Sequence, residues 1–234
     1  MDAITSGDCI KGVVPIENSL GGPINITYDL LSHDYDLKIE SEIIININHN
    51  LLAPKGVKIE DITDVYSHYQ ALVQCHNYLE KMGFKIHPTS STAYAAKIIQ
   101  KSKNVSAIGT LKAAELYDLH VLKKNIQDAT NNQTRFIVLS NNDSNNRINV
   151  KTAIVFSLYE DNPGGLYGIL GIFVEFNINL TKIESRPSKK YLGDYIFFID
   201  FEGHRKDENI SKILTLIENN TSFFKVLGSY YLIE

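Results

Sequence analysis

The sequence predicts two regions in tandem: an α/β region in front and a smaller α+β domain of βαββαβ order behind. In the front region, short apolar strands alternate with helices, which is typical of α/β architecture. In the back region, two helical faces are interleaved with four strand-like segments, as in a split β-α-β domain. A polar, turn-forming segment separates the two regions, so we expect domains at 1–140 and 150–234 and a linker at 141–149.

The front region offers five short apolar segments that are expected as strands, at 13–16, 64–66, 84–86, 105–108 and 136–139. Three of them run into helices whose apolar residues share one face. The first helix carries Leu72, Val73, Leu79 and Met82, the second Ala93, Ala96 and Ile99, and the third Ala113, Ala114 and Leu116.

In the back region, residues 151–159 are β-branched and aromatic and predict a strand. A break at Pro163-Gly164-Gly165 precedes a helix whose apolar face is Leu166, Ile169, Leu170 and Phe173. Strands are expected at 179–185 and 195–201, and the second helix has the face Ile210, Ile213, Leu214 and Ile217. A strand at 223–233 ends the region. This order predicts a four-stranded antiparallel sheet with helices on one face.

Composition and charge exclude several classes of protein. The 234 residues are 44% hydrophobic and carry a net charge of −4, so no basic face for nucleic acid is expected. No apolar run approaches the ~18 residues of a membrane span, and the first residues lack a signal-peptide pattern. Cys9 and Cys75 have no metal-type spacing and are expected as buried, reduced thiols. We therefore expect a cytoplasmic protein with no cofactor and no metal.

Four joints after front-region strands carry small polar residues: Glu17-Asn18-Ser19, Ser67 to Gln70, Thr89 to Thr92, and Gly109-Thr110. Helix N-termini attract anions, and open α/β sheets bind ligands beyond the carboxyl ends of their strands. Together the joints predict a cleft for a small carboxylate-rich ligand. The alternative at each joint is helix capping alone, and Ser67 with Gln70 has the spacing of a capping box.

Five segments resemble one enzyme family. Segment 12–19 resembles the PIENS segment of prephenate dehydratases. Segment 67–75 resembles their S-H-P-Q-A-x-x-Q-C segment, with Tyr69 where Pro is usual. Segment 91–96 is similar to their S-T-A-x-A-A helix start, and 132–136 resembles N-x-T-R-F. Segment 178–187 resembles the E-S-R-P segment of a phenylalanine-binding ACT domain. The resemblance implies a periplasmic-binding-protein-like front region and a ferredoxin-like ACT domain.

One departure from the family pattern lies at the N-terminus. Family members usually begin earlier, with a strand and a G-P-x-G-T-[FY] loop, and Met1 falls where the family already enters the helix before PIENS. We expect either a gene start placed too late or a truncated, inactive chain.

The family converts prephenate to phenylpyruvate in L-phenylalanine biosynthesis, with loss of water and carbon dioxide. The resemblance makes Thr134 the leading catalytic residue, as a hydrogen-bond donor to the departing oxygen. Glu17 is the second, as a proton donor whose pKa should rise beside a dianionic substrate. Arg135 is expected to hold a substrate carboxylate or to orient the Thr134 loop. Substrate-binding candidates are Asn18, Ser19, Ser67, Gln70, Gln74, Ser91, Thr92, Arg135 and Phe136.

For the back domain, the resemblance implies feedback inhibition by L-phenylalanine bound at a subunit interface. Gly164, Gly165 and Leu166 would face one side of the ligand, and the other side would be closed by Asn179, Leu180, Glu184, Ser185 and Arg186. Pairing of ACT domains implies a homodimer as the minimum, or a homotetramer.

Three other functions remain open at this point. An arogenate dehydratase would perform the same chemistry on the transaminated substrate, and the sequence does not separate the two. A truncated, non-catalytic phenylalanine-binding protein would keep only the regulatory half. A small-anion-binding module would have no chemistry, but it does not account for the Thr134-Arg135-Phe136 segment.

Overall fold

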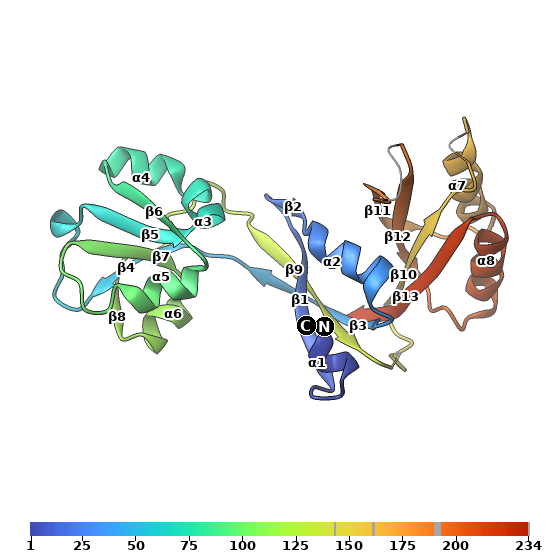
Figure 1. Ribbon diagram of the computed structural model, residues 1–234, viewed down its shortest axis with the longest axis horizontal. Coiled ribbons are helices and arrows are strands. Elements are labelled where there is room, and N and C mark those ends of the chain that lie inside the picture. The colour runs from blue at the N-terminus through green and yellow to red at the C-terminus, as the bar shows by residue number, and fades with distance from the viewer. Residues whose placement is uncertain (143, 161, 190–192, 234) are drawn as a thin grey trace. The chain divides into compact units, whose positions relative to one another are not determined.

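A computed structural model describes residues 1–142, 144–160, 162–189 and 193–233 (Figure 1). Two compact units divide the chain: unit 1 is Met1–Glu17, Pro23–Ile45 and Arg135–Glu234, and unit 2 is Asn18–Gly22 and Asn46–Thr134. The expected linker at 141–149 contains Asp143, which lies outside the described residues, and the expected domain limits stay a prediction. Among the described residues, no helix is long and apolar enough to cross a membrane.

Unit 2 is built on a five-stranded sheet of order β6-β5-β7-β4-β8. Strand β5 runs parallel to β6 and β7, and β4 runs antiparallel to β7 and β8. The strands are β4 Asn50–Pro54, β5 Asp64–His68, β6 Lys85–Thr89, β7 Val105–Gly109 and β8 Leu119–Lys123. The helices are the 3₁₀ turn η2 Ile59–Asp61, α3 Tyr69–Gln74, α4 His76–Met82, α5 Thr92–Ile98 and α6 Leu111–Leu116.

Two features of unit 2 differ from the sequence prediction. The helix expected to carry both Leu72 and Met82 is two helices, because Cys75 between them has a non-helical backbone (φ −118°, ψ 20°). Strands β4 and β8 were not predicted. Strand β4, between β7 and β8, is buried along its whole length, with Leu51 and Ala53 in one core cluster and Leu52 in another. Burial on both faces removes the alternation that marks a half-exposed strand.

Unit 1 contributes most of an eight-stranded sheet of order β11-β12-β10-β13-β3-β9-β1-β2. The strands are β1 Lys11–Asn18, β2 Gly22–Pro23, β3 Lys38–Asn46, β9 Gln133–Ser140, β10 Val150–Ser157, β11 Leu180–Pro187, β12 Tyr195–Glu202 and β13 Phe223–Leu232. The helices are α1 Asp2–Thr5, α2 Asn25–Asp29, the π-helix η1 Leu30–Asp34, α7 Gly165–Glu175 and α8 Glu208–Asn219. The four back-region strands pair antiparallel, which confirms the βαββαβ prediction.

The back-region sheet does not end at β13. Strand β13 pairs in parallel with β3 of the front region, with Tyr231 opposite Ser41 and Leu232 opposite Glu42. Strands from both ends of the sequence therefore form one sheet. The sequence contained no signal for this pairing, because parallel partners so far apart in the chain have no connecting turn between them.

Both faces of the back-region sheet are covered, where the sequence predicted helices on one face. In β10, Ile154 and Phe156 pack with α7 and α8, which lie beside each other on one side of the sheet in Figure 1. The alternate residues Ala153 and Val155 pack on the opposite side, in a core that includes Tyr28 of α2. A strand with two buried faces is apolar at successive positions, which explains the unbroken run Ala153 to Phe156.

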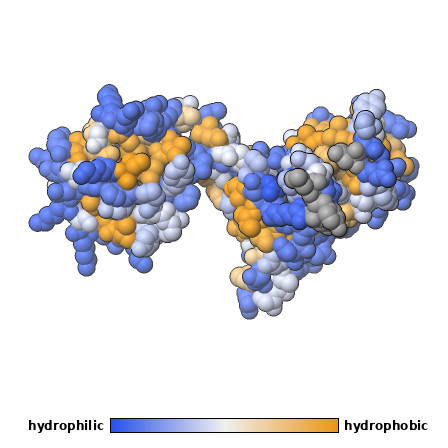
Figure 2. Space-filling model, turned by 45° about the horizontal axis from the view of Figure 1, so that its top comes forward, coloured by the Kyte–Doolittle hydropathy of each residue, from blue (hydrophilic) through white to orange (hydrophobic). Residues whose placement is uncertain are grey.

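Some hydrophobic side chains remain at the surface of each unit (Figure 2). In unit 2 these include Val73 and Ile86. In unit 1, Tyr167 and Val174 of α7 are 80% and 79% exposed. Helix α7 thus buries one face in the core and presents apolar residues on the other.

Gly228 marks the closest approach between β13 and β3. Its φ is +145°, and a Cβ built on it would lie 2.4 Å from the carbonyl oxygen of Ile39. That neighbour is backbone, which cannot turn aside as a flexible side chain could. The position therefore requires glycine both for its conformation and for the close contact.

We predict that Gly228→Ala lowers the free energy of unfolding by about 2 kcal/mol or more, because the added methyl group must separate the two strands. Urea denaturation followed by circular dichroism would measure the change. Gly171→Ala is the matched control. Its Cβ meets nothing within 4 Å and it lies inside α7, so it should leave stability unchanged or raise it by up to about 1 kcal/mol. Equal midpoints for wild type and Gly228→Ala would contradict the prediction.

Candidate functional site

Asn18 joins the PIENS-like segment to the segment that contains Thr134. Its Nδ2 group lies 2.9 Å from Thr134 Oγ1, 2.8 Å from Asn132 Oδ1 and 3.0 Å from the carbonyl oxygen of Gln133, and donates to these acceptors. Its Oδ1 accepts from the backbone N–H of Gly21 at 2.8 Å. Because Thr134 Oγ1 is an acceptor here, its own hydroxyl hydrogen stays available. Among the described residues, no protein group accepts it.

A second layer of hydrogen bonds supports Asn18 and Thr134. Asn132 Nδ2 donates to Gln74 Oε1 at 2.9 Å, and His49 Nε2 lies 2.8 Å from the same oxygen. An amide oxygen only accepts, so His49 donates from Nε2. Burial lowers the pKa of His49 and outweighs the opposing hydrogen bond to Gln74, which keeps the ring neutral. We call Asn18, His49, Gln74, Asn132 and Thr134 the Thr134 cluster.

Sequence reasoning did not single out His49 or Asn132. Both are buried, at 6% and 2% exposure. His49 was one of seven histidines without metal spacing, and nothing in its neighbourhood along the chain pointed to Gln74. Asn132 did stand within the N-x-T-R-F segment, so the motif contained a signal for it.

Three of the four predicted joints gather at one edge of the unit 2 sheet. They follow β5, β6 and β7, which are adjacent and parallel, so their carboxyl ends meet at the same edge. Capping is also confirmed at two of them. Ser91 Oγ accepts from the N–H of Tyr94 at 3.0 Å, and Thr110 Oγ1 accepts from that of Ala113 at 3.1 Å.

The predicted capping box at Ser67 is wrong. Strand β5 extends through His68, and the Nδ1 atom of His68 accepts from the N–H of Gln70 at 3.3 Å to cap α3. Ser67 is fully buried in the strand, where its Oγ donates to the carbonyl oxygen of Ile108 at 2.9 Å. Ser67 therefore secures β5 against β7 and does not begin the helix that carries Gln70 and Gln74.

Of the remaining substrate-binding candidates, Ser19 and Gln70 lie beside the Thr134 cluster or its turn, and Thr92 and Phe136 make no hydrogen bond to it. Ser19 Oγ donates to the carbonyl oxygen of Asn131 at 2.7 Å and accepts from the N–H of Gln133 at 2.9 Å, which closes the turn beside the cluster. Exposed Gln70 lies over Gly21, since a Cβ there would be 2.7 Å from its Nε2. Thr92 at the start of α5 and Phe136 in β9 share no hydrogen bond with these residues.

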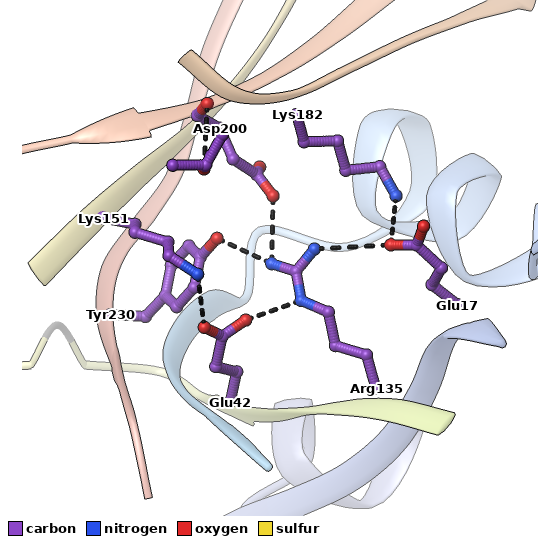
Figure 3. Close-up of polar contacts among 8 residues, drawn as sticks. Glu17, Glu42, Arg135, Lys151, Lys182, Asp200 and Tyr230 are labelled. Carbon is purple, nitrogen blue, oxygen red and sulfur yellow. Dashed lines mark hydrogen bonds and ion pairs between the residues drawn. The ribbon is translucent and has the colours of Figure 1, made fainter. Parts of the chain in front are cut away.

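Arg135 has different partners from those the sequence suggested. Its Nε donates to Glu42 at 2.6 Å, and its Nη2 donates to Asp200 at 2.9 Å and to Tyr230 Oη at 2.6 Å (Figure 3). Burial alone would lower the pKa of Arg135, but these neighbours raise it above its ordinary value. The guanidinium is thus occupied by the protein's own carboxylates. The expectation that it holds a substrate carboxylate has no support in these contacts.

Glu17 lies in the same group of charges. Its Oε2 is 2.7 Å from Lys182 Nζ and 3.6 Å from Arg135 Nη1. Burial alone would raise the pKa of Glu17, but the hydrogen bond to Lys182 and the charges of Lys182 and Arg135 outweigh it, so the pKa is lowered. In this structure Glu17 is an ion-pair partner. The rise in its pKa beside a dianionic substrate stays a prediction.

The predicted phenylalanine-binding residues fall into two groups. Gly164 and Gly165 line a pocket of about 530 Å³ at the start of α7, together with Leu158, Gly168 and Ile172. Leu166 packs instead against the core beneath α7. The second group lies on or beside β11, and none of its members lines this pocket: Asn179, Leu180, Glu184, Ser185 and Arg186. The resemblance places that group across a subunit interface, which one chain does not test.

Arg186 is also paired within the chain. Its Nε and Nη2 atoms lie 3.2 Å and 3.0 Å from Asp29 Oδ1, and its Nη1 donates to Asn25, both in α2. Lys189 Nζ donates to the other oxygen of Asp29 at 2.7 Å. Arg186 therefore ties β11 to α2, which is a contact the sequence prediction did not include. Among the described residues, no group of three His, Cys, Asp or Glu side chains could hold a metal ion. Both cysteines are free thiols; Cys75 is buried as expected, but Cys9 is exposed.

Comparison with known proteins places the chain in a family. The prephenate dehydratase family model matches residues 1–144, and the ACT domain model matches residues 152–215. A protein of Methanocaldococcus jannaschii named prephenate dehydratase is 48% identical over 223 residues, covering 94% of this chain and 80% of that protein. An Arabidopsis thaliana protein named arogenate dehydratase/prephenate dehydratase 2 is 43% identical over 94% of this chain, which spans 60% of that protein.

A solved structure supports the same assignment. Prephenate dehydratase from Arthrobacter aurescens in complex with L-Phe superimposes with a TM-score of 0.88 at 34% identity, covering 98% of this chain and 78% of that one. Sequence and fold lead to the same family. The chain belongs to the prephenate dehydratase family and carries an ACT domain behind the dehydratase region.

Proposed function

We propose that the protein converts prephenate to phenylpyruvate, as a lyase of L-phenylalanine biosynthesis. The observation that supports this most directly is the hydrogen bond from Asn18 to Thr134 Oγ1, which leaves the threonine hydroxyl hydrogen free to donate. The two residues come from the two segments that most resemble the family, and buried Asn132 and Gln74 hold them in place.

In the proposed reaction, the bond between the ring and its carboxylate breaks and carbon dioxide leaves. The electron pair enters the ring and expels the hydroxyl group from the opposite ring carbon, which makes the ring aromatic. The departing oxygen gains negative charge as its bond breaks. Thr134 O–H donates a hydrogen bond to this oxygen, and a positioned donor of this kind contributes about 10²–10³ in rate. A proton must also reach the oxygen for water to leave. Glu17, which the resemblance offers for this step, is held in an ion pair with Lys182.

Arogenate is the second candidate substrate. The Arabidopsis thaliana relative is named for both arogenate and prephenate dehydratase activity. Assay of the purified chain with each substrate separates the two. Binding of phenylalanine without turnover of either would identify a non-catalytic binding protein.

We further propose feedback inhibition by L-phenylalanine, with the ligand in the pocket beside Gly164 and Gly165. The pocket has the size for a small amino acid, and the Arthrobacter aurescens relative is described in complex with L-Phe. A homodimer or homotetramer would supply the residues near β11 from a second chain. The exposed Tyr167 and Val174 of α7 offer apolar surface for such a contact.

We predict that Thr134→Ala lowers kcat by at least about 10²-fold, because the hydrogen-bond donor to the departing oxygen is lost. Thr134→Ser keeps a hydroxyl group at the same position and should keep most of the rate. Steady-state formation of phenylpyruvate measures both, and thermal unfolding checks that both variants fold. Equal kcat values for wild type and Thr134→Ala would remove Thr134 from the mechanism.

We predict that Gly168→Leu weakens inhibition by phenylalanine, with the half-inhibiting concentration rising about tenfold or more, because a bulky side chain would fill the pocket. A Cβ at Gly168 meets nothing within 4 Å, so the change fits the fold. Gly171→Leu is the matched control, since Gly171 is also open in α7 but does not line the pocket. Each inhibited rate is compared with that variant's own uninhibited rate, and equal inhibition curves would place the ligand elsewhere.

A further inference from the structure

Six charged side chains and one tyrosine from the shared sheet gather around Arg135 (Figure 3). Seven of the eight strands contribute one residue each: Glu17 from β1, Glu42 from β3, Arg135 from β9, Lys151 from β10, Lys182 from β11, Asp200 from β12 and Tyr230 from β13. We call these residues the Arg135 cluster. The first three lie within the dehydratase match at 1–144, and Lys182 and Asp200 lie within the ACT match at 152–215. Lys151 and Tyr230 lie just outside the ACT match, on strands of the same back-region sheet.

The Arg135 cluster is balanced in charge and closely packed. Three carboxylates meet three cations: Glu42 binds Arg135 at 2.6 Å and Lys151 at 2.7 Å, while Asp200 binds Arg135 at 2.9 Å. The Glu42 side chain is 2% exposed and that of Lys182 is 11% exposed. A buried charge that loses its partner is left in a medium of low polarity, so each member of the cluster holds its neighbours in place.

Glu17 and Arg135 are chain neighbours of the Thr134 cluster. Glu17 precedes Asn18 in β1, and Arg135 follows Thr134 in β9. Successive residues of a strand point to opposite faces of its sheet. Glu17 and Arg135 therefore act on Asn18 and Thr134 through the backbone, and they do so from the face away from those two side chains.

Lys182 is the ACT-domain residue that binds Glu17. Its Nζ lies 2.7 Å from Glu17 Oε2 and 5.0 Å from the centre of the Tyr28 ring, a position that favours a cation. Lys182 also stands opposite Asp200 in the pairing of β11 with β12, so it lies beside two members of the Arg135 cluster. It lies on β11, among the residues expected to close over phenylalanine.

We propose that Lys182 of the ACT domain is a positioning residue for the dehydratase reaction: through Glu17 and Arg135 it sets the backbone at Asn18 and Thr134, and it transmits the state of β11 to them. This inference rests on the proposed function for its kinetic consequences. Movement of β11 when the effector binds would draw Lys182 from Glu17 and shift the strand end that carries Asn18. Phenylalanine would then lower turnover without touching the substrate.

The test compares two methionine variants, because methionine keeps the length of lysine and removes its charge. Lys182→Met breaks the contact with Glu17. Lys225→Met is the matched control. Lys225 lies on β13 of the same back-region sheet and donates to front-region carbonyl oxygens, of Leu31 at 2.9 Å and Tyr35 at 2.7 Å. It lies outside the Arg135 cluster. Lys182→Arg restores the charge and is the rescue variant.

We expect Lys182→Met to lower kcat by about 10- to 10²-fold with little change in KM, since a small displacement of catalytic groups has an effect of this size. Phenylalanine should still bind, by calorimetry, but the factor by which it inhibits should fall about fivefold or more. Lys182→Arg should recover most of the wild-type kcat. Lys225→Met should match wild type in kcat and inhibition, although it loses stability. Equal effects of the two methionine variants would overturn the proposal.

Amide hydrogen exchange gives a readout that does not need activity. Lys182→Met should speed exchange at residues 18–20 and 133–136 relative to both wild type and Lys225→Met. If the wild-type protein turns over neither prephenate nor arogenate, the proposed function is rejected. Amide hydrogen exchange in the two methionine variants would then still test whether Lys182 positions the backbone at Asn18 and Thr134. Equal exchange in Lys182→Met and Lys225→Met would reject that role.

Discussion

The pairing of Glu42 with both Arg135 and Lys151 is the interaction on which the rest of unit 1 depends. Glu42 lies on β3, and its two cations come from β9 of the dehydratase region and β10 of the ACT domain. Loss of one partner from a buried ion pair costs about 3–5 kcal/mol, because the remaining charge has no compensation. Strand β3 is also the partner of β13, so the same residue lies beside the junction that joins the two regions into one sheet.

Through this junction, the ACT domain becomes part of the same sheet and core as the dehydratase region. Helices α7 and α8 cover one face of its sheet, and the other face packs on a core that contains Ile4, Tyr28 and Leu31. Arg186 adds a polar connection from β11 to Asp29 of α2. The regulatory domain is therefore packed on the dehydratase region over much of its sheet, and not only tethered by a linker. A ligand that shifts an ACT strand shifts the partners of Glu17 and Arg135 with it.

Side chains alternate between the two faces of a strand, so neighbouring residues have different functions. In β9 and β1, Thr134 and Asn18 form the hydrogen-bonded pair suited to chemistry, while Arg135 and Glu17 bind the charges of the sheet. The resemblance placed all four in one site, because a sequence motif does not show which face of the sheet each side chain points to. In the structure, the side chains of Asn18 and Thr134 belong to the Thr134 cluster, while those of Glu17 and Arg135 point to the opposite face and bind charges on neighbouring strands.

The sequence by itself determined five front-region strands, the βαββαβ order of the back region, the family and the segments that carry Asn18 and Thr134, but it missed β3, β4 and β8. These follow from local patterns: apolar periodicity, turn residues and motifs, each read within a few residues. Only the tertiary structure decided that β13 joins β3, that His49 reaches Thr134 through Gln74, Asn132 and Asn18, and that Arg135 binds Glu42 and Asp200. Those contacts join residues up to 190 positions apart, as Tyr231 and Ser41 are in the pairing of β13 with β3. A buried charge or amide has no water to bind, so it must pair with a protein group that the fold brings near it. Local sequence patterns do not show which distant group that is.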